Sequence, residues 1–395
     1  MKRAGDDSCL DVLLRIASSE DGSAAEAAVE ALAALPKGKV DEKISSRLKT
    51  ARGKERLVLI RMVGRRLIPA VDVLKEAAAD PDLAISGAAL TSLGQVAGFD
   101  DLSLLIERTL KPRSDEEGGI ARKALRTACL RMTDRDACAK RLAAAAESAD
   151  LAGRIALMEI LAEMGGPVAL DAMAEAAGSP QKELQDAATR LLGEWMSVDA
   201  APVLLDIAKR KGPYQVRALR GYIRLIRQFD MDDRTRVSMC RSALAAATRK
   251  DEVLLVFDAA QRYPSLDMLR LVVAVAENAD VRKEATTAAM QIAQQLPASA
   301  EVAELLQKVG YRPVRLQILE ARYGAEGKEK DVTAVVRRAA KDMPLIVLPS
   351  ASYNQAFGGD PVPGVVKELR IRYRMDGREG EATFRENATI VLPMP

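Results

Sequence analysis

The segment between Ser8 and Leu296 repeats one pattern about nine times: an Ala/Leu-rich amphipathic stretch, a short polar or Pro/Gly break, and a second such stretch. The second stretches begin near residues 23, 53, 81, 116, 150, 181, 214, 250 and 281, so one repeat is roughly 28 to 36 residues long. A unit of that length can bury its apolar face only against neighbouring units. The sequence therefore predicts an α-solenoid of stacked helical hairpins over residues 1–310.

Two repeats show the helix boundaries most clearly. In the third, Pro69 is expected to open the first helix and Asp80-Pro81 to separate it from the second; Pro167 and Ser179-Pro180 do the same in the sixth. Three- and four-residue spacing then predicts the buried stripes Leu83, Ala84, Gly87, Leu90, Leu93 and Gly94 in the third repeat and Leu184, Ala187, Ala188, Leu191 and Leu192 in the sixth. Adjacent hairpins are expected to cross closely where small residues recur, at Ala88, Ala187 and Ala218.

Composition and charge limit the classes of partner. The chain is 48% hydrophobic but 3% aromatic, so its core must consist of aliphatic side chains, and its net charge is only +3. A clustered basic excess, expected for binding to nucleic acid or an anionic membrane, is absent from the repeats. No apolar run is long enough to span a bilayer. The amino terminus lacks a signal-peptide core, which favours the cytoplasm unless a leader preceding Met1 has been trimmed away.

This pattern resembles HEAT repeats, particularly the short bacterial variety grouped with phycobilisome lyases. The resemblance covers roughly residues 8 to 309 and depends on the early Pro, the Asp/Ser-Pro turn and Ala-x-x-Ala/Leu in the second helix. It implies a right-handed superhelix with the second helices on the concave face and a role in protein binding. No residue here matches the lyase activity, and the iron-dependent hydroxylases of this fold need His-Glu motifs that the chain lacks.

A second domain, mostly β, is predicted over residues 311–395, because the Ala-rich helical texture stops at about Gly310-Tyr311. Within it the sequence predicts a strand at 314–323, a short helix capped by Asp331, a strand at 345–348 and a turn-rich loop at 349–364.

A β-hairpin is the clearest local prediction. Apolar and charged residues alternate up to Asp376-Gly377, which favours a two-residue type I′ turn. That turn fixes the strand pairs as Arg374 with Glu379, Arg372 with Glu381, Ile371 with Ala382, Leu369 with Phe384 and Glu368 with Arg385. Opposite charges then share one face, so the three arginines Arg370, Arg372 and Arg374 are better explained as a solvated sheet face than as an anion site.

The tail resembles an uncharacterised β-rich domain found at the carboxyl end of mitochondrial J-domain proteins and in large planctomycete-type bacterial proteins. The resemblance spans about residues 316 to 393, and its most specific pieces are Tyr323-Gly324, Asp331-Val332-Thr333, Gly359-Asp360-Pro361, Gly364 and Lys367. HEAT arrays of those bacteria resemble the repeats too. No activity follows from this resemblance.

The sequence lacks most of the residues and motifs on which common catalytic mechanisms depend. The chain has no histidine, which excludes histidine bases, Ser-His and Cys-His nucleophile pairs and histidine-bound metals. Phosphate-binding glycine loops are absent as well. The acidic clusters Asp115-Glu116-Glu117 and Asp230, Asp232, Asp233 lie at expected helix starts, where they favour the helix dipole. The four dispersed cysteines are interpreted as small buried residues. We therefore predict no enzyme activity, no metal and no cofactor.

The candidate partner-binding residues are Arg217, Arg220, Arg224, Arg227, Arg190 and Trp195. The first four follow the apolar stripe Val216, Leu219, Ile223 and Ile226 at the same spacing one residue later, so they share one flank of a helix. Arg190, Arg126, Arg122, Arg65 and Arg61 occupy broadly comparable second helices. These arginines either pair with acidic residues of neighbouring hairpins or form a basic strip for an anionic ligand.

Three functions follow from these observations. The leading prediction is a non-catalytic scaffold that binds a protein or an acidic peptide on its concave helical surface. The alternative is a nucleic-acid-binding HEAT array that uses the arginine strip, although HEAT-type glycosylases use an aromatic-lined cleft and Trp195 is the single tryptophan here. The third is an accessory region of a carbohydrate-active protein, because similar repeat and tail modules occur in large bacterial proteins beside hydrolase-like domains.

Overall fold

The computed structural model describes residues 7–19, 22–210, 212–297, 299–310, 314–325, 327–341, 343–388 and 390–393. The chain forms two compact units, Met1–Gly221 and Tyr222–Pro395, whose boundary falls inside helix α14 (Gln215–Gln228).

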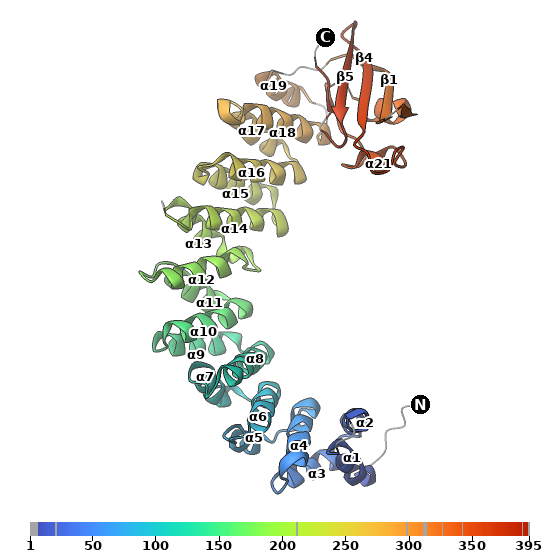
Figure 1. Cartoon of the computed structure of the whole chain (residues 1–395). Coiled ribbons are helices and arrows are strands. Elements are labelled where there is room, and N and C mark those ends of the chain that lie inside the picture. The colour runs from blue at the N-terminus through green and yellow to red at the C-terminus, as the bar shows by residue number, and fades with distance from the viewer. Residues whose placement is uncertain are drawn as a thin grey trace. The chain divides into compact units, whose positions relative to one another are not determined.

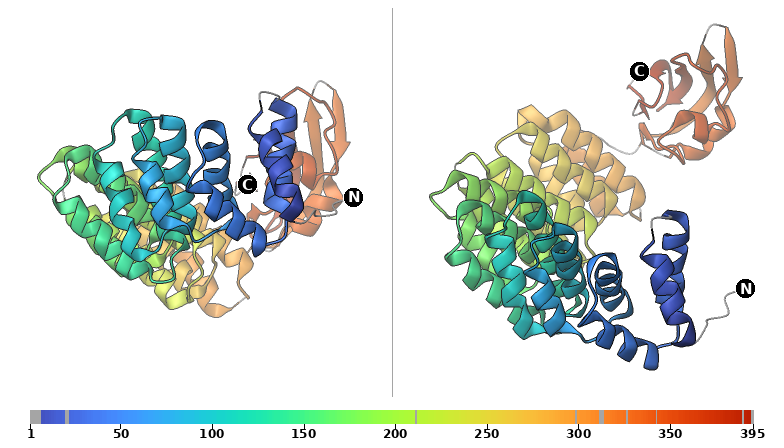
Figure 2. Two further views of the ribbon diagram at one scale, coloured as in Figure 1. Left: turned by 90° about the horizontal axis from the view of Figure 1, so that it is seen from below. Right: turned by 60° about the horizontal axis from the view of Figure 1, so that its bottom comes forward.

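The first unit consists of helical hairpins in sequence order. Its helices are α1 (Leu10–Ala17), α2 (Gly22–Ala34), α3 (Lys39–Leu48), α4 (Gly53–Arg66), α5 (Val71–Ala78), α6 (Leu83–Val96), α7 (Leu102–Leu110), α8 (Asp115–Arg131), α9 (Arg135–Glu147), α10 (Leu151–Met164), α11 (Pro167–Ala177), α12 (Lys182–Gly193), α13 (Ala201–Lys209) and the first half of α14. The second helices of successive hairpins lie side by side (Figure 1, Figure 2).

The second unit continues the hairpins and adds a sheet. Its helices are the rest of α14, α15 (Asp233–Ala246), α16 (Lys250–Arg262), α17 (Leu266–Val275), α18 (Arg282–Gln295), α19 (Ala300–Lys308), α20 (Thr333–Ala339) and α21 (Tyr353–Ala356). Its strands are β1 (Leu316–Ala325), β2 (Lys328–Asp331), β3 (Leu345–Ile346), β4 (Glu368–Met375), β5 (Arg378–Arg385) and β6 (Ile390–Val391). Across the described ranges of both units, each of the nine predicted second stretches is a helix, from α2 to α18 at even numbers, so the solenoid prediction is confirmed.

The helix boundaries agree with the sequence to within two residues. Pro167 is the first residue of α11 as predicted, whereas α5 begins two residues after Pro69. Helix α6 starts beyond Pro81, at Leu83, because the carboxylate of Asp82 accepts the N–H of Ala84. The buried stripe of the sixth repeat is confirmed.

The buried stripe of the third repeat is only partly as predicted. Gly87, Leu90, Leu93 and Gly94 are buried, Leu83 is half-buried, and Ala84 is exposed. The predicted stripe was therefore wrong at Ala84. The backbones of neighbouring second helices approach most closely at glycines: a Cβ placed on Gly94 would lie 2.9 Å from the Cα of Ala124, and one on Gly221 would lie 2.9 Å from the Cα of Gly193. Of the small residues expected at the crossings, Ala187 and Ala218 are buried and Ala88 is half-buried.

A buried arginine closes the end of helix α2. Arg66, on α4, is 4% exposed and its guanidinium donates to Asp41 Oδ1 at 2.6 Å. It also donates to the carbonyl oxygens of Leu32, Ala33, Leu35 and Pro36 at 2.8, 3.2, 2.9 and 3.0 Å. Leu32 and Ala33 lie in the last turn of α2, where carbonyl groups lack intrahelical partners, and Leu35 and Pro36 follow directly after the helix. In the second unit Arg236 does the same for the end of α14, where it stacks 3.5 Å from the ring centroid of Tyr263.

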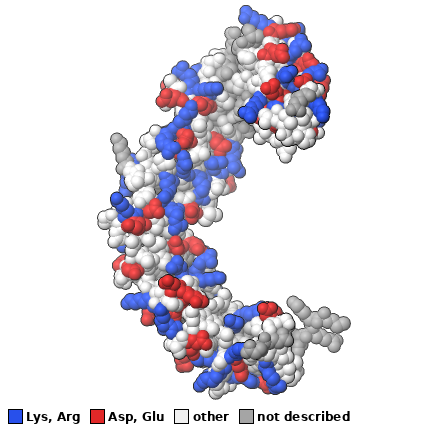
Figure 3. All heavy atoms as spheres, viewed as in Figure 1, with Lys and Arg blue, Asp and Glu red and all other residues white. Residues whose placement is uncertain are grey.

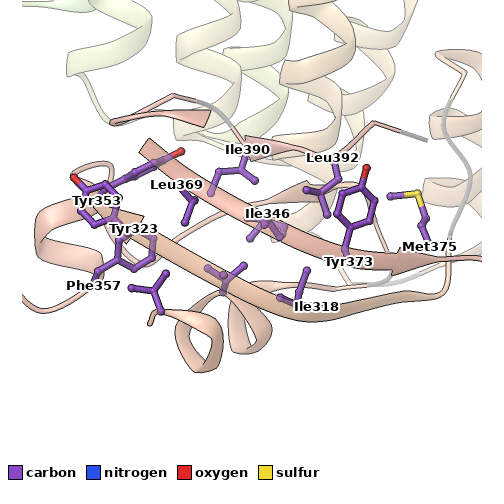
Figure 4. Close-up of a cluster of buried hydrophobic side chains, with 14 of the residues drawn as sticks. Ile318, Tyr323, Ile346, Tyr353, Phe357, Leu369, Tyr373, Met375, Ile390 and Leu392 are labelled. Atoms are coloured by element: carbon purple, nitrogen blue, oxygen red, sulfur yellow. The ribbon is translucent and has the colours of Figure 1, made fainter. Parts of the chain in front are cut away.

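The carboxyl-terminal sheet has the strand order β2-β1-β4-β5, all antiparallel, and a separate pair β3-β6. One face of the sheet covers an apolar cluster (Figure 4). At one end of this cluster the rings of Tyr323, Tyr353 and Phe357 pack together, with ring centroids 5.1 to 5.7 Å apart. Tyr373 and Met375 extend the cluster along β4. Most of the aromatic side chains of this part of the chain therefore serve as core.

The predicted hairpin is confirmed in register. Strand β4 pairs with β5 as Arg374 with Glu379, Arg372 with Glu381, Ile371 with Ala382, Leu369 with Phe384 and Glu368 with Arg385. Asp376 and Gly377 have φ of 48° and 88°, as a type I′ turn requires. The charged face is solvated as expected: Arg374 pairs with Glu379, while Arg372 pairs with Glu320 of β1 at 3.4 Å.

Other predictions for this region needed correction. The strand expected at 345–348 is shorter, and the loop expected at 349–364 contains the short helix α21. Asp331 lies one residue before the cap position of α20, and its carboxylate accepts the N–H of Thr333 at 2.9 Å. Strands β2 and β6 were not predicted because they are short and polar or terminal. The predicted domain boundary at 310/311 adjoins residues 311–313, which lie outside the described ranges, and it stays a prediction.

Within the second unit the sheet domain contacts the last complete hairpin. The side-chain amide of Gln294, on α18, donates to the carbonyl of Leu345, and Lys341 Nζ donates to the carbonyl of Gln294 at 2.8 Å. Gln294 is buried. The β domain is thus joined to the last turn of α18 by hydrogen bonds.

Candidate functional site

The acidic clusters and possible metal ligands of the described residues can be placed in the structure. Within them no group of three or more Cys, Asp or Glu side chains could hold a metal ion. The acidic cluster at 115–117 starts α8, where Ser114 caps the helix and buried Glu117 accepts from Arg113 N and Nε at 2.6 and 2.9 Å. Burial alone would raise the pKa of Glu117, but these hydrogen bonds outweigh it and lower the pKa. The acidic residues at 232 and 233 start α15 in the same way.

The buried cysteines are poorly suited to act as nucleophiles. Cys9, Cys129, Cys138 and Cys240 form no disulfide, and the last three are buried. Burial raises the pKa of Cys129 and of Cys240 to about 12. Side chains with such pKa values stay protonated near neutral pH and are poor nucleophiles.

The arginines predicted to bind a partner are engaged within the protein. In the first unit Arg217 donates to Asp186 Oδ1 at 2.8 Å and to Thr189 Oγ1 at 3.2 Å. In the second unit Arg227 pairs with Asp258 at 2.8 Å. Arg220 and Arg224 also interact with other residues of the protein. The structure thus gives these arginines the intramolecular partners that the sequence left open.

The other two candidates differ from each other. Arg190 is exposed and pairs with Glu159 of α10 at 3.3 Å. Trp195 is 3% exposed, so its indole belongs to the interior, and we withdraw it as a partner-contacting residue. Its position just after α12 explains the error, because sequence periodicity does not extend past the end of a helix.

Ion pairs between neighbouring second helices form a series that we call the ion-pair ladder. In the first unit its members are Glu30–Arg65 between α2 and α4, Arg126–Glu163 between α8 and α10, Glu159–Arg190 between α10 and α12, and Asp186–Arg217 between α12 and α14. All of these side chains are well exposed, so each pair contributes less than about 1 kcal/mol to stability. On the face in view, basic and acidic side chains are interspersed (Figure 3). Neither sign dominates this surface.

The ladder is interrupted at α6. The sequence LAISGAALTSLGQV of α6 contains no charged residue, so this helix cannot pair with α4 or α8. At the interruption the surface is hollowed to a volume of about 830 Å³, and the residues around it come from the second helices α2, α4, α6 and α8 and the residue after α4. We call this depression the α6 hollow. It was missed from the sequence, although the absence of charge on one second helix out of nine was visible there.

The α6 hollow is mainly apolar. Its floor is formed by the short side chains of α6, among them Ala84, Ala88 and Thr91, and its walls include Ile120 of α8 and Leu67 after α4. Leu67 is 56% exposed and has φ 58°, a left-handed conformation that suits glycine and costs a leucine roughly 1 kcal/mol. An exposed leucine held in this conformation beside an apolar depression is unfavourable for the isolated chain. Such local strain is typical of binding sites.

The β domain contains a second polar cluster. Lys367 is 2% exposed, and its ammonium donates to Asp360 Oδ2 at 3.0 Å, to the Val365 carbonyl at 3.0 Å and pairs with Glu386 at 3.4 Å. Burial lowers the pKa of Lys367, but the two carboxylates outweigh it and raise the pKa above its usual value. Asn354 joins the cluster by donating to Glu386 at 2.9 Å. The three N–H donors of the Lys367 ammonium thus each have an acceptor, so the cluster has a structural role.

The comparisons with known proteins bear on the fold. No protein-family model matches the chain, and no curated protein matches it in sequence. Human deoxyhypusine hydroxylase, solved in complex with glycerol, is similar over 66% of this chain and 96% of its own length, with 17% identity and a TM-score of 0.26.

Two further solved structures resemble the chain. The complex of CpcE and CpcF of phycocyanin lyase from Nostoc sp. PCC7120 covers 60% of this chain and 94% of its own length, with 15% identity and a TM-score of 0.29. Escherichia coli YibA covers 74% and 98%, with 10% identity and a TM-score of 0.33. These likenesses concern the helical-repeat fold alone. No helix in the described ranges is long and apolar enough to cross a membrane.

Proposed function

We propose that the protein is a non-catalytic scaffold that binds another protein on the exposed face of its second helices, with the α6 hollow as the central contact. The observation that carries the proposal is the coincidence of the interrupted ion-pair ladder with an apolar depression of about 830 Å³. An exposed apolar depression with a polar rim is the usual form of a protein-binding site. The absence of histidine from the sequence supports the non-catalytic part.

Nucleic-acid binding is less well supported by the same surface. A polyanion would have to compete for Arg217, Arg190 and Arg126 with the carboxylates that already pair with them. Free cations along a groove, which nucleic-acid binding requires, are therefore few on the ladder helices.

The finer affiliation suggested by the sequence is also part of this proposal. We infer that the β domain is related to the carboxyl-terminal domain of J-domain proteins and of planctomycete-type proteins. Supporting this, Tyr323, Asp360 and Lys367, which carry the resemblance, meet in one place: Tyr323 donates to Asn354 at 2.9 Å, and Asn354 donates to Asp360 at 3.3 Å.

The test is affinity purification from native lysate with a matched pair of variants. Ala84→Trp places a large side chain in the α6 hollow, whereas Ala144→Trp places the same side chain at an exposed position of the first helix α9. We expect the wild type and Ala144→Trp to recover the same stoichiometric protein partner and Ala84→Trp to lose it.

Two results would contradict the proposal that a protein partner binds at the α6 hollow. One is a partner that Ala84→Trp retains in full. The other is the recovery of nucleic acid, or turnover on a substrate panel, without any stoichiometric protein. Equal melting temperatures of the two tryptophan variants serve as the control for folding.

A further inference from the structure

The two ends of the α6 hollow carry opposite charges. Helices α6 and α8 run parallel, because a Cβ on Gly87 would meet Ile120 and one on Gly94 would meet Ala124. Glu116 comes one helical turn before Ile120, so it lies beside the start of α6.

The opposite end of the hollow is basic. Ser92 Oγ donates to the carbonyl of Ile60 at 2.8 Å, and a Cβ on Gly64 would meet Ser92, so Arg65 lies beside the second half of α6 and Arg61 one turn earlier, near the middle of α6. Arg65 is shared with Glu30 of the ladder, but Arg61 forms no ion pair within the described ranges. The same holds for Glu116 at the acidic end.

The dimensions of the hollow suit one helix. From Leu83 to Gln95, both of which line it, α6 rises about 18 Å, or a little over three helical turns. The short side chains of the floor let a second backbone approach closely. A bound helix would place its apolar stripe on the floor and leave its polar side in water.

An extended peptide suits the hollow less well. Its walls and floor are helices, whose backbone N–H and C=O groups are already paired along most of their length. An extended chain would leave its own backbone groups without partners where the hollow excludes water. A helix satisfies these groups internally, so the helical form of the ligand is favoured.

We propose that the α6 hollow binds a single amphipathic helix of a partner protein, oriented antiparallel to α6, with acidic side chains in its first turn against Arg61 and basic side chains in its last turn against Glu116. This inference rests on the scaffold function proposed above and specifies its ligand. The same order of charges stabilises the ligand helix itself, because acids at the amino end and bases at the carboxyl end complement the helix dipole.

The test uses a displayed library of 14-residue amphipathic helices whose charged positions are random mixtures of Glu and Lys. The library is selected on the full chain and, in parallel, on the double variant Arg61→Glu, Glu116→Lys, in which the two ends exchange their charges. Both residues lie at the rim without ion-pair partners in the described ranges, so the exchange should leave the fold intact.

We expect the wild-type chain to enrich peptides with Glu in the first turn and Lys in the last, about tenfold at low ionic strength over the reversed order. The double variant should enrich the reversed order. Because both chains meet the same peptides, differences in intrinsic helicity cancel. Ala84→Trp should abolish the enrichment, and Ala144→Trp should preserve it.

The inference is overturned if no peptide is enriched, if both chains select the same charge order, or if Ala84→Trp selects as the wild type does. The scaffold function fails separately. If the native partner requires an open α6 hollow but the charge order does not reverse, only the assigned helix and its orientation are wrong.

Discussion

Replacing Arg66 with alanine should destabilise the amino-terminal hairpins far more than replacing its neighbour Arg65. Arg66 is 4% exposed and donates to one carboxylate and four carbonyl groups, whereas the Arg65 side chain is 43% exposed and makes one surface ion pair with Glu30. Hydrogen bonds to a charged donor contribute about 1.5 to 3 kcal/mol each when buried, but they are not additive. Breaking a buried charge pair costs about 3 to 5 kcal/mol.

We therefore expect Arg66→Ala to lose about 4 kcal/mol and Arg65→Ala less than about 1 kcal/mol. Arg66→Lys should fall between them, at about 2 kcal/mol, because an ammonium has three donors for five acceptors. Since a solenoid unfolds locally, the assay is hydrogen exchange of α2 and α3, in which 4 kcal/mol corresponds to roughly a thousandfold faster exchange. The reasoning is refuted if Arg66→Ala exchanges no faster than Arg65→Ala.

Three further predictions concern other parts of the chain. Leu67→Gly should raise stability by about 1 kcal/mol in denaturant titration, since glycine suits φ 58°, yet weaken partner binding; a loss of stability would contradict the strain assigned to Leu67. The hydrogen bond from Lys367 helps to lower the pKa of Asp360 in the folded protein. Ionised Asp360 therefore stabilises the fold at pH values above the ordinary pKa of an aspartate, and this stabilisation is lost as the pH falls through the lowered pKa. Lys367→Met should therefore lower the melting temperature more at pH 7 than at pH 3, measured by tyrosine circular dichroism; an equal loss at both pH values would exclude the ionic origin. Deletion of residues 311–395 should lower the melting temperature of the array and promote its association; an unchanged melting curve with a monomeric profile in size-exclusion chromatography would show that the β domain is an independent appendage.

The local structure could be predicted because it depends on nearby residues. The repeat spacing determined where second helices form, and the alternation of charge around Asp376-Gly377 determined the register of the hairpin. In both cases a different helix position or strand register would expose an entire apolar face to water. Strands of two to four residues, such as β2 and β6, carry too few alternations for that argument.

The candidate site could be predicted only in part, because its properties depend on which helices meet. Arg65 and Arg66 are adjacent in sequence, but they differ by one helical step of about 100°. The Arg65 side chain therefore lies in water, whereas the Arg66 side chain is buried at the end of α2. The spacing of the α14 arginines left open whether they pair with neighbouring hairpins, and the carboxylates that Arg217 and Arg227 contact could be identified only from the way the hairpins stack. The α6 hollow lies where the short, uncharged side chains of α6 interrupt the ion-pair ladder, and this coincidence is seen only once the neighbouring helices are in place.

The most direct test of the central claim is photo-cross-linking in native lysate. A photoreactive benzoylphenylalanine is introduced at position 84, on the floor of the α6 hollow, or at position 144, exposed on α9. The account predicts a discrete cross-linked protein band of defined mass for position 84 and none for position 144. A band at position 144 with none at position 84 would contradict the claim that the second-helix face is the binding surface.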